Sequence, residues 1–474
     1  MPEHIEALEH MSYLIFMKKL EDYENNRIIA AKKSKKEYSS IFENNENKRW
    51  SVWKNYPAEK RLQHIRETVF PFLKNLKKEN SRIKLDLGDS YFEIKSPILL
   101  EEAVNAIDDL KITQQNLDSQ GDIYEYMTSH LKTAGLNGQF RTPRHIIRMM
   151  VEILDPKIGQ TICDPACGTG GFLINSYLHI LKQNTSEDLI KYDQENVPHN
   201  LIGDKLTDSQ RNFLMNKQFF GFDFSNAMIQ ISQMNMILHG FTQPQIQYAN
   251  SLGKQFNQEE EFDVIFANPP FSGNLNKSEI NDDFRVETNS TELLFMELFY
   301  NKLVVGGQAV VIVPTGALYG TDKAHKNIRK LLLENCRIDA IISMPSGIFR
   351  PYTGQATSIL FFTKGEKTKE IWFYVMENDG FKLDTNHNKL IKENDIPDIL
   401  QKIKTKLISE KSWIASFDEI KEKKWNLDAA RYKPIKKELT PSSDPIKLLD
   451  EIKTLEEDIV STVDIIKKDI QDLE

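Results

Sequence analysis

The spacing of apolar residues along the chain predicts three regions. In residues 1–116 the apolar residues recur every three or four positions, as in YLIFMKKLEDYE and LQHIRETVFPFLKNL, which predicts helices that bury one face. In residues 117–398 short apolar runs alternate with helical stretches, and in residues 399–474 the helical spacing returns. We therefore expect a helical N-terminal domain, a central α/β domain and a helical C-terminal segment.

The central region contains seven apolar runs of strand length, separated by helical stretches such as FLINSYLHILKQ and AMIQISQMNMILHG. Strands that alternate with helices predict a doubly wound, Rossmann-like α/β sheet. Ligands of such sheets bind beyond the carboxyl ends of the strands, so we expect the functional residues in the loops at that edge. The seven runs are TICDPAC, FFGFDF, IQYANS, FDVIFANPP, GQAVVIVPTG, DAIISMP and TSILFFTKG.

The last region carries an apolar stripe at heptad-like spacing, with charged residues between its members. The pattern indicates either a coiled-coil or partner-binding helix, or a helix that packs on its own domain. The stripe consists of Leu448, Ile452, Leu455, Ile459, Val463, Ile466, Ile470 and Leu473.

Composition and charge narrow the class of protein. Of the 474 residues 40% are hydrophobic and 27% are charged, as in ordinary globular proteins. Three cysteines, apolar runs too short to cross a bilayer and an N-terminus without a basic leader predict a cytoplasmic protein. The net charge of -8 is unusual for a protein that grips DNA alone, because phosphate neutralisation dominates such binding. Either basic residues gather on one face, for example in NNRIIAAKKSKKEYSS, or a partner supplies part of the grip.

The run CDPACGTGGFLINSYLHI joins a predicted strand to a predicted helix through Gly168, Gly170 and Gly171. Glycines at such a turn let backbone N–H groups approach a ligand. The loop lacks the Lys-Ser/Thr pair of a phosphate-binding P-loop, and Asp164 stands at its start. The acid suits a cofactor that carries a sulfonium and an ammonium group. Cys163 is one of two cysteines that flank it, and their C-x-x-x-C spacing without a companion pair indicates apolar packing rather than a zinc site.

The next predicted strand ends in GFDF, which places Asp223 where a carboxylate accepts hydrogen bonds from both hydroxyls of a ribose. Taken alone, an acid at a strand end is often only solvated. In combination with the glycine loop, Asp223 is a candidate cofactor ligand.

The run FDVIFANPPF ends a predicted buried strand with Asn268, Pro269, Pro270 and Phe271. Two prolines cannot extend a central strand, so the chain must leave the sheet there. The Asn268 side-chain oxygen and the Pro269 carbonyl would then be two fixed acceptors for an aromatic amine, whose nitrogen becomes nucleophilic as it pyramidalises. Phe271 offers a face on which a flipped base can stack. Methylation of cytosine C5 needs a thiolate, and the sequence contains no Pro-Cys pair.

These motifs resemble the modification subunits of type I restriction-modification systems, a family of N6-adenine DNA methyltransferases. The likeness extends over nearly the whole chain, through YLIFMKKL, GDIYEYM, GQFRTPR, DPACGTGGFL, ANPPF, MPSGIFRPYTGQATSILFFTKG and WNLDAARY. It implies methyl transfer from S-adenosylmethionine to adenine in double-stranded DNA. It also implies a helical N-terminal region that clamps DNA and C-terminal helices that pack on a separate specificity subunit. A restriction motor subunit is a further candidate partner, with two copies of the chain in the complex.

The resemblance also assigns roles to residues of this chain. Gly168, Thr169 and Gly170 would hold the methionine part of the cofactor, Asp223 its ribose, and residues 268–271 the target adenine. The segment expected to contact S-adenosylmethionine is Gln139, Phe140, Arg141, Thr142, Pro143 and Arg144.

Three further residues are candidates by their position relative to these motifs. Where related enzymes often carry an acid that meets the cofactor's adenine amine, this chain has Asn250, whose amide oxygen still accepts a hydrogen bond. Phe349 and Tyr352 either line the base pocket or pack within the protein.

Two other functions stay open: methylation of a protein glutamine, which uses a similar Asn-Pro-Pro-aromatic site ending in Tyr, and an inactive scaffold of a defence complex.

Overall fold

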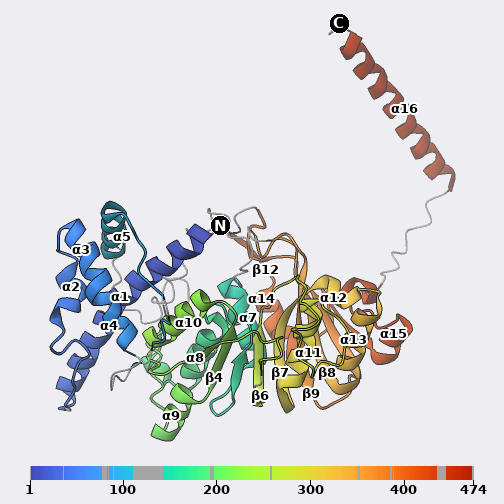
Figure 1. Cartoon of the computed structure of the whole chain (residues 1–474). Coiled ribbons are helices and arrows are strands. Elements are labelled where there is room, and N and C mark those ends of the chain that lie inside the picture. The colour runs from blue at the N-terminus through green and yellow to red at the C-terminus, as the bar shows by residue number, and fades with distance from the viewer. Residues whose placement is uncertain are drawn as a thin grey trace. The chain divides into compact units, whose positions relative to one another are not determined.

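The structure is a computed structural model of the chain. Its two compact units are residues 1–432 and residues 433–474. The larger unit holds the sheet and nearly all helices, and the smaller one holds the last helix (Figure 1). The residues described are 2–35, 37–76, 83, 85–88, 90–109, 142–192, 197–256, 259–350, 353–384, 387, 389–434 and 445–471.

The larger unit is built on a nine-stranded sheet with the strand order β13-β10-β8-β9-β7-β6-β1-β4-β5. All seven predicted strands are in it, and the prediction of a doubly wound α/β fold is confirmed. Two short hairpins, β2–β3 and β11–β12, lie outside it. The strands are β1 (Ile162–Asp164), β2 (Lys191–Tyr192), β3 (Pro198–His199), β4 (Phe219–Asp223), β5 (Gln245–Tyr248), β6 (Phe262–Ala267), β7 (Leu303–Pro314), β8 (Cys336–Ser343), β9 (Thr357–Lys364), β10 (Glu370–Val375), β11 (Asp379–Phe381), β12 (Leu390–Asn394) and β13 (Ser412–Ser416).

The strand order reverses between β1 and β6, which are parallel neighbours. From β1 the chain proceeds through β4 to β5 at one edge, and from β6 it proceeds through β7 in the other direction. β9 is antiparallel to both β7 and β8. A reversal of this kind leaves a crevice at the carboxyl ends of the two central strands, where doubly wound folds bind ligands.

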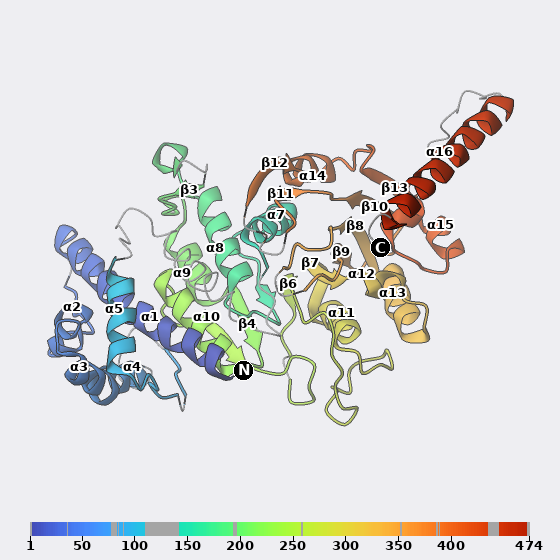
Figure 2. The same cartoon turned by 90° about the horizontal axis from the view of Figure 1, so that it is seen from above.

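Helices cover both faces of the sheet because successive strand residues point to opposite sides. In β6, Val264 and Phe266 join one hydrophobic core, and Ile265 and Ala267 join the other. Figure 2 shows α7, α8 and α14 on one side of the sheet and α11 and α13 on the other. The helices of this part are α7 (Arg144–Leu154), α8 (Gly171–Gln183), α9 (Asp208–Asn216), α10 (Asn226–Leu238), α11 (Thr291–Lys302), α12 (Thr315–Tyr319), α13 (Lys323–Asn335), α14 (Ile396–Ile403) and α15 (Phe417–Glu422).

The expectation that residues 399–474 are wholly helical is wrong. Residues Ser412–Ser416 form β13, which pairs antiparallel with β10 at the edge of the sheet. Trp413 and Ala415 of this strand are buried in the same core as α11 and α13. The strand is short and lies between helices, so the sheet pairing, rather than its own apolar pattern, decides its conformation.

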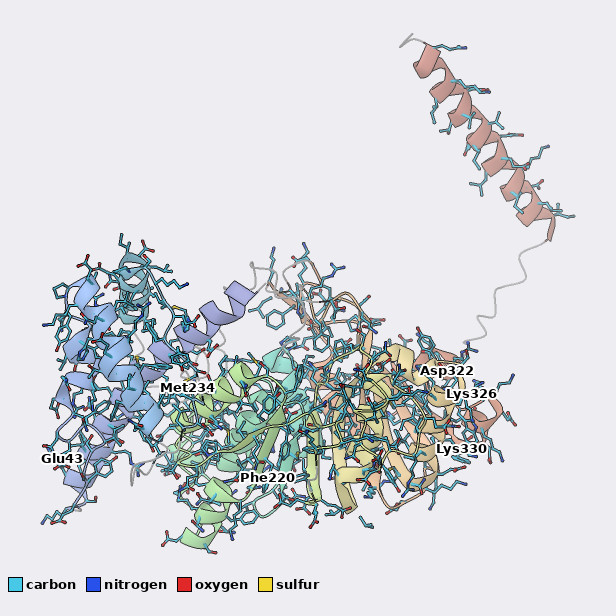
Figure 3. The ribbon with its side chains drawn as sticks, in the orientation of Figure 1. Glu43, Phe220, Met234, Asp322, Lys326 and Lys330 are labelled. Atoms are coloured by element: carbon cyan, nitrogen blue, oxygen red, sulfur yellow. The ribbon has the colours of Figure 1, made fainter. Side chains whose placement is uncertain are left out.

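The N-terminal residues form the predicted helices. A third hydrophobic core joins them to α10, in which all residues from Met228 to Leu238 are buried. The side chains between α10 and the N-terminal helices include Met234 (Figure 3). The expected boundary at 116/117 lies outside the described residues, so that division stays a prediction. The helices are α1 (Pro2–Lys33), α2 (Trp50–Trp53), α3 (Ala58–His64), α4 (Phe70–Asn75) and α5 (Pro97–Asp109), and Ile65–Val69 is a π-helical turn.

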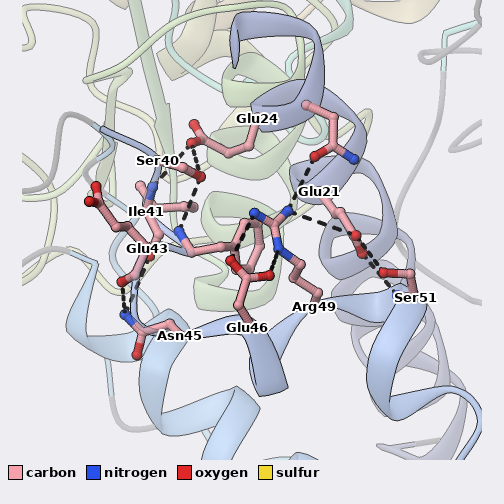
Figure 4. Close-up of polar contacts among 11 residues, drawn as sticks. Glu21, Glu24, Ser40, Ile41, Glu43, Asn45, Glu46, Arg49 and Ser51 are labelled. Atoms are coloured by element: carbon pink, nitrogen blue, oxygen red, sulfur yellow. Dashed lines mark hydrogen bonds and ion pairs between the residues drawn. The ribbon is translucent and has the colours of Figure 1, made fainter. Parts of the chain in front are cut away.

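Two carboxylates of α1 hold the chain that follows it. Glu24 is 1% exposed and accepts hydrogen bonds from the Ser40 hydroxyl and the Ile41 amide (Figure 4). Glu21 accepts from the amide and hydroxyl of Ser51, at the start of α2. These bonds fix the path of a segment that has few apolar residues of its own.

The second unit contains α16 (Pro445–Gln471), which carries the predicted heptad-like stripe. Of the stripe, Ile452, Leu455, Ile459, Val463 and Ile466 are 44–63% exposed. Among the described residues no helix has the length and apolar character needed to span a membrane.

Candidate functional site

Two of the predicted motifs leave the sheet side by side. β1 and β6 are adjacent and parallel, with Ile162 opposite Val264 and Cys163 opposite Ile265. The glycine loop follows β1, and residues 268–271 follow β6, so both begin at the carboxyl edge of neighbouring strands. Adjacent strands are about 4.8 Å apart. The glycine loop and the Asn-Pro-Pro-Phe segment therefore open into the same crevice.

The glycine loop requires its glycines for two different reasons. Gly168 (φ +51°) and Gly170 (φ +80°) have the left-handed backbone that side chains disfavour. A Cβ on Gly170 would lie 2.7 Å from the Ser232 hydroxyl, whereas one on Gly168 would meet nothing within 4 Å. Gly168 thus borders open space at the start of the turn, and Gly170 permits close packing on α10.

The side-chain carboxylate of Asp223 is hydrogen-bonded to the backbone of the glycine loop. One carboxylate oxygen accepts a hydrogen bond from the Gly168 amide at 3.0 Å, and the other accepts from the Ser225 amide at 2.9 Å. Burial raises the pKa of this carboxyl, and the two amide donors act in the opposite direction. The strand end, the loop and the start of α10 are therefore joined before any ligand binds.

Asp164 lies beneath the same loop and is 1% exposed. Its carboxylate accepts a hydrogen bond from the Ala166 amide at 3.0 Å. Burial raises its pKa to about 8, with nearby Asp223 acting in the same direction. A buried acid with few partners would be stabilised in its ionised form by a cation. The flanking Cys163 is buried and unpaired, and burial raises the pKa of its thiol well above the ordinary value.

Asn268 differs from Asp223 and Asp164 in its hydrogen bonding. Both its side-chain oxygen and its side-chain nitrogen are buried and have no hydrogen-bond partner among the described residues. Buried polar atoms without partners cost about 1–3 kcal/mol each and are rare in folded proteins. Pro269 is buried and Pro270 is half-buried, so the backbone that carries Asn268 is fixed. The Asn268 amide is thus held ready to bond to a group from outside the chain.

The comparison with known proteins follows the same residues. Residues 115–440 match the N-6 DNA Methylase family, which includes the crevice and both of its loops. The chain belongs to the N-6 DNA methylase family. Within it, the methylase is similar to type I restriction enzyme methylase subunits.

Two relatives show the extent of this similarity. The EcoEI methylase subunit of Escherichia coli is 33% identical over 84% of this chain and 80% of its own length. The StySPI methylase subunit of Salmonella potsdam is 28% identical over 69% of this chain and 62% of its own length.

Solved structures agree with the fold. A chain from a study of complex assembly and conformational transition of the type I R-M system is 26% identical, with a TM-score of 0.69, over 99% of this methylase and 94% of that chain. A modification subunit of a proposed type I restriction enzyme from Vibrio vulnificus is 26% identical, with a TM-score of 0.68, over 87% of this chain and 88% of that one.

The expected cofactor segment of the methylase is described in part. Gln139, Phe140 and Arg141 lie outside the described residues. Thr142 and Pro143 precede α7, and Arg144 is its first residue. α7 packs closely on the loop, since a Cβ on Gly171 would lie 3.1 Å from Ile147. Burial, with nearby Arg148, lowers the pKa of Arg144 to about 10. The start of α7 and the glycine loop are therefore neighbours, as the motif order predicts.

The aromatic residues near Asn268 are packed inside the protein. Phe271 is 2% exposed and Phe349 is 1% exposed, and their rings meet edge to face at 5.1 Å. A base can stack on Phe271 only after its cover moves. Of the two alternatives for Phe349, the structure has the packed one, and Tyr352 lies outside the described residues.

Asn250 follows β5 at the same carboxyl edge and is exposed. Its amide oxygen accepts a hydrogen bond from the Leu252 amide at 3.2 Å, so in this state it closes a turn. A contact with the cofactor would use the remaining lone pair.

Sequence reasoning missed several residues that position the glycine loop. Asn235 of α10 donates from its amide nitrogen to the Thr169 carbonyl at 3.1 Å. The Ser251 hydroxyl donates to the Pro165 carbonyl at 2.6 Å. Phe224, next to Asp223, is 66% exposed. Of these residues, only Phe224 could have been found from the sequence, because it is an aromatic residue next to the predicted ribose ligand. The polar residues of α10 look like ordinary helix positions.

Proposed function

We propose that this methylase transfers a methyl group from S-adenosylmethionine to the N6 atom of adenine in DNA, at a site selected by a separate specificity subunit. The family match supports the reaction, and the unpartnered amide of Asn268 is the observation that carries the assignment of the site. In the crevice between β1 and β6 this amide lies where an extruded base would enter.

The residues present fit S-adenosylmethionine. Gly168 borders open space at the turn, Asp164 is a buried acid without a cation, and Phe224 exposes an aromatic ring beside Asp223. We propose that Asp164 and the loop Gly168–Gly170 hold the methionine end. Asp223 and Phe224 would hold the ribose and the adenine face, and Asn250 the adenine amine. Thr142, Pro143 and Arg144, with the preceding Gln139, Phe140 and Arg141, would close the pocket. When bound, the cofactor supplies a methyl group on a positively charged sulfur.

The reaction requires the target amine to become a better nucleophile. The Asn268 amide oxygen and the Pro269 carbonyl would each accept a hydrogen bond from one N–H group of the target amine. These two hydrogen bonds favour a pyramidal nitrogen whose lone pair is directed at the methyl group. Pro270 keeps the two acceptors in place, and Phe271 would stack on the base once Phe349 has moved. No covalent intermediate with the protein is needed.

The resemblance to modification subunits also suggests which proteins this methylase binds. We propose that the exposed stripe of α16 packs on the specificity subunit, since five of its apolar residues are solvent-exposed and such stripes commonly bind another helix. We further propose two copies of the chain per complex, a restriction subunit as an additional partner, and a cytoplasmic location. A specificity subunit that carries basic surface would compensate for the net charge of -8.

The experiment combines the methylase, a specificity subunit encoded beside it, double-stranded DNA and labelled cofactor. We expect N6-methyladenine in the DNA by mass spectrometry of nucleosides, and no product with Asn268→Ala. Asn216→Ala, at the half-buried end of α9, is the matched control and should retain activity.

Two results would contradict the proposal. Label that enters protein glutamine in the absence of DNA would favour the alternative amide methyltransferase. Failure of the cofactor to bind in calorimetry would favour an inactive scaffold. Methylation of adenine by Asn268→Ala would leave the family assignment intact and refute the role of Asn268.

A further inference from the structure

Two histidines and an aspartate meet where the β11–β12 hairpin contacts the first turn of α7. His145 lies in the first turn of α7, Asp379 in β11, and His387 between β11 and β12. The Nε2 atoms of His145 and His387 lie 2.8 Å and 2.9 Å from the same Asp379 oxygen, Oδ2. The three ligand atoms are all within 4.8 Å of one another. The hairpin and α7 lie side by side in Figures 1 and 2.

The geometry of His387 is not that of a simple hydrogen-bonded pair. Its side chain is 3% exposed, and its Nε2 has no hydrogen-bond partner although Asp379 is at contact distance. The backbone of His387 is left-handed, with φ at +45°. Such a conformation costs about 1–3 kcal/mol in a residue with a side chain and is found most often at functional sites. His387 thus has a strained backbone, and its imidazole nitrogen, which has no hydrogen-bond partner in the described part of the chain, lies beside a buried carboxylate.

Asp379 presents one oxygen to both histidines. Its other oxygen, Oδ1, accepts a hydrogen bond from the Phe381 amide at 3.1 Å. The carboxyl is buried, yet the two nearby imidazoles lower its pKa against the opposing effect of burial. The Phe381 ring stacks on His145 at 4.6 Å and fixes the plane of that imidazole. All three groups are therefore oriented toward one point.

We propose that His145, Asp379 and His387 bind a divalent transition-metal ion, with zinc as the ion that fits the donor set best. Two imidazoles and one carboxylate are a common ligand set for zinc and also for non-haem iron(II). Ligand atoms bonded to one zinc ion in tetrahedral geometry lie about 3.3 Å apart. The two distances from Asp379 Oδ2 to the imidazole nitrogens, 2.8 Å and 2.9 Å, are about 0.5 Å shorter than this value, and the two imidazole nitrogens lie within 4.8 Å of each other. The His145 side chain is 22% exposed, so water can complete the coordination shell.

The ion would attach the β11–β12 hairpin to the first turn of α7. His145 directly follows Arg144, the last residue of the expected cofactor segment. Fixing this turn would stabilise the segment in its binding position, a consequence that rests on the proposed function. Metal binding itself does not depend on the proposed function and can be measured without cofactor or DNA.

The test uses the full chain purified without a polyhistidine tag. After loading with zinc and gel filtration, we expect about one zinc ion per chain by elemental mass spectrometry, with iron measured in the same sample. Cobalt(II), added instead of zinc, should give the visible absorption of a protein-bound ion. Retention of iron in place of zinc would identify the ion and preserve the site.

Variants separate a metal site from an ion-pair cluster. His387→Ala and Asp379→Asn should each lose the bound metal. Removal of an outer-shell partner lowers metal affinity by about 10–100-fold, and removal of a direct ligand should lower it further. His179→Ala is the matched control, because His179 contacts Asp155 at 2.8 Å without a second histidine. It should retain the metal. Circular dichroism establishes that each variant is folded.

The wild-type chain alone can refute the proposal. If it retains no stoichiometric metal and gives no cobalt spectrum, the three residues form only a hydrogen-bonded cluster. Metal retained at the wild-type level in both His387→Ala and Asp379→Asn would place any binding elsewhere. Should both variants fail to fold, His145→Gln, at the more exposed ligand, decides between these outcomes.

Discussion

The glycine loop and the Asn-Pro-Pro-Phe segment leave adjacent strands, yet they differ in how their polar groups are satisfied. In the glycine loop, both oxygens of Asp223 are bonded to backbone amides, and Asn235 donates to the Thr169 carbonyl. In the other segment, both polar atoms of Asn268 are buried without partners. Within the described part of the chain, the polar groups of the glycine loop have partners, and those of Asn268 have none.

The difference matches two tasks. A cofactor that binds in every turnover benefits from a loop that is already ordered, because less conformational entropy is lost on binding. A catalytic acceptor must accept its strongest hydrogen bonds from the reacting group, and internal donors would compete with that group. Asn268 therefore reduces stability in the free protein, and Asp223 contributes to it.

The largest effect is expected from Asn268→Ala. Loss of the acceptor should reduce kcat for DNA methylation by about 10²–10³-fold, as for removal of one preorganised group that stabilises a transition state. The thermal midpoint should stay equal or rise, since no internal hydrogen bond is lost. Asn235→Ala should instead lower the midpoint, because the Thr169 carbonyl loses its donor. If Asn268→Ala and Asn235→Ala lowered the thermal midpoint equally, the proposed difference between the two segments would be wrong.

Asp223→Asn is expected to have the next largest effect. An amide nitrogen cannot accept, so either Gly168 or Ser225 loses its partner. A lost hydrogen bond to a charged group costs about 1.5–3 kcal/mol, which raises the Kd for S-adenosylmethionine by about 10–100-fold. Asp263→Asn is the control, because Asp263 also accepts two bonds, from Thr161. Isothermal calorimetry should find cofactor affinity unchanged in that control.

Substitution of Gly170 should lower the stability of the protein more than substitution of Gly168. Gly170→Ala combines a left-handed backbone with a contact of 2.7 Å to Ser232, whereas Gly168→Ala has the backbone strain alone. Strain of this kind costs about 1–2 kcal/mol, so the thermal midpoint should fall further for Gly170→Ala. Gly168→Ala should weaken cofactor binding more than it lowers stability, because its new methyl group enters the open space. The reverse order in either measurement would contradict the assigned packing.

The last prediction concerns pH. The pKa of Asp164 is raised by burial to about 8, above its unfolded value near 3.8. Between these values the folded chain binds the extra proton, so the stability of the cofactor-free protein should fall as pH rises from about 4 to 8. The slope is at most about 1.4 kcal/mol per pH unit. Asp164→Asn should reduce it in thermal melts from pH 5 to 8. Identical slopes in wild type and variant would exclude Asp164 as the source.

Much of the fold could be predicted because each central strand carries its own signal. Runs such as GQAVVIVPTG are apolar on both faces, as buried parallel strands are. β13 could not be predicted in the same way, since SWIAS is short and is a strand through its pairing with β10. The complete burial of α10 was also hidden, because its second buried face depends on α1 and the other N-terminal helices.

The site divides in a similar way. Asp223 and Asn268 could be predicted because the chemistry requires those residue types at strand ends. The packing of Phe271 against Phe349 could not, because the two residues are far apart in the sequence and either side chain could have faced the crevice.

The sequence by itself determined the class of reaction, because the glycine loop, Asp223 and Asn268–Phe271 are local motifs whose order and residue types are typical of the family. The tertiary structure decided which polar groups are satisfied. Asn235 reaches Thr169 across 66 positions, and His145 reaches Asp379 across 234. Such contacts depend on how helices and hairpins pack on the sheet, and no local pattern of residues encodes that packing.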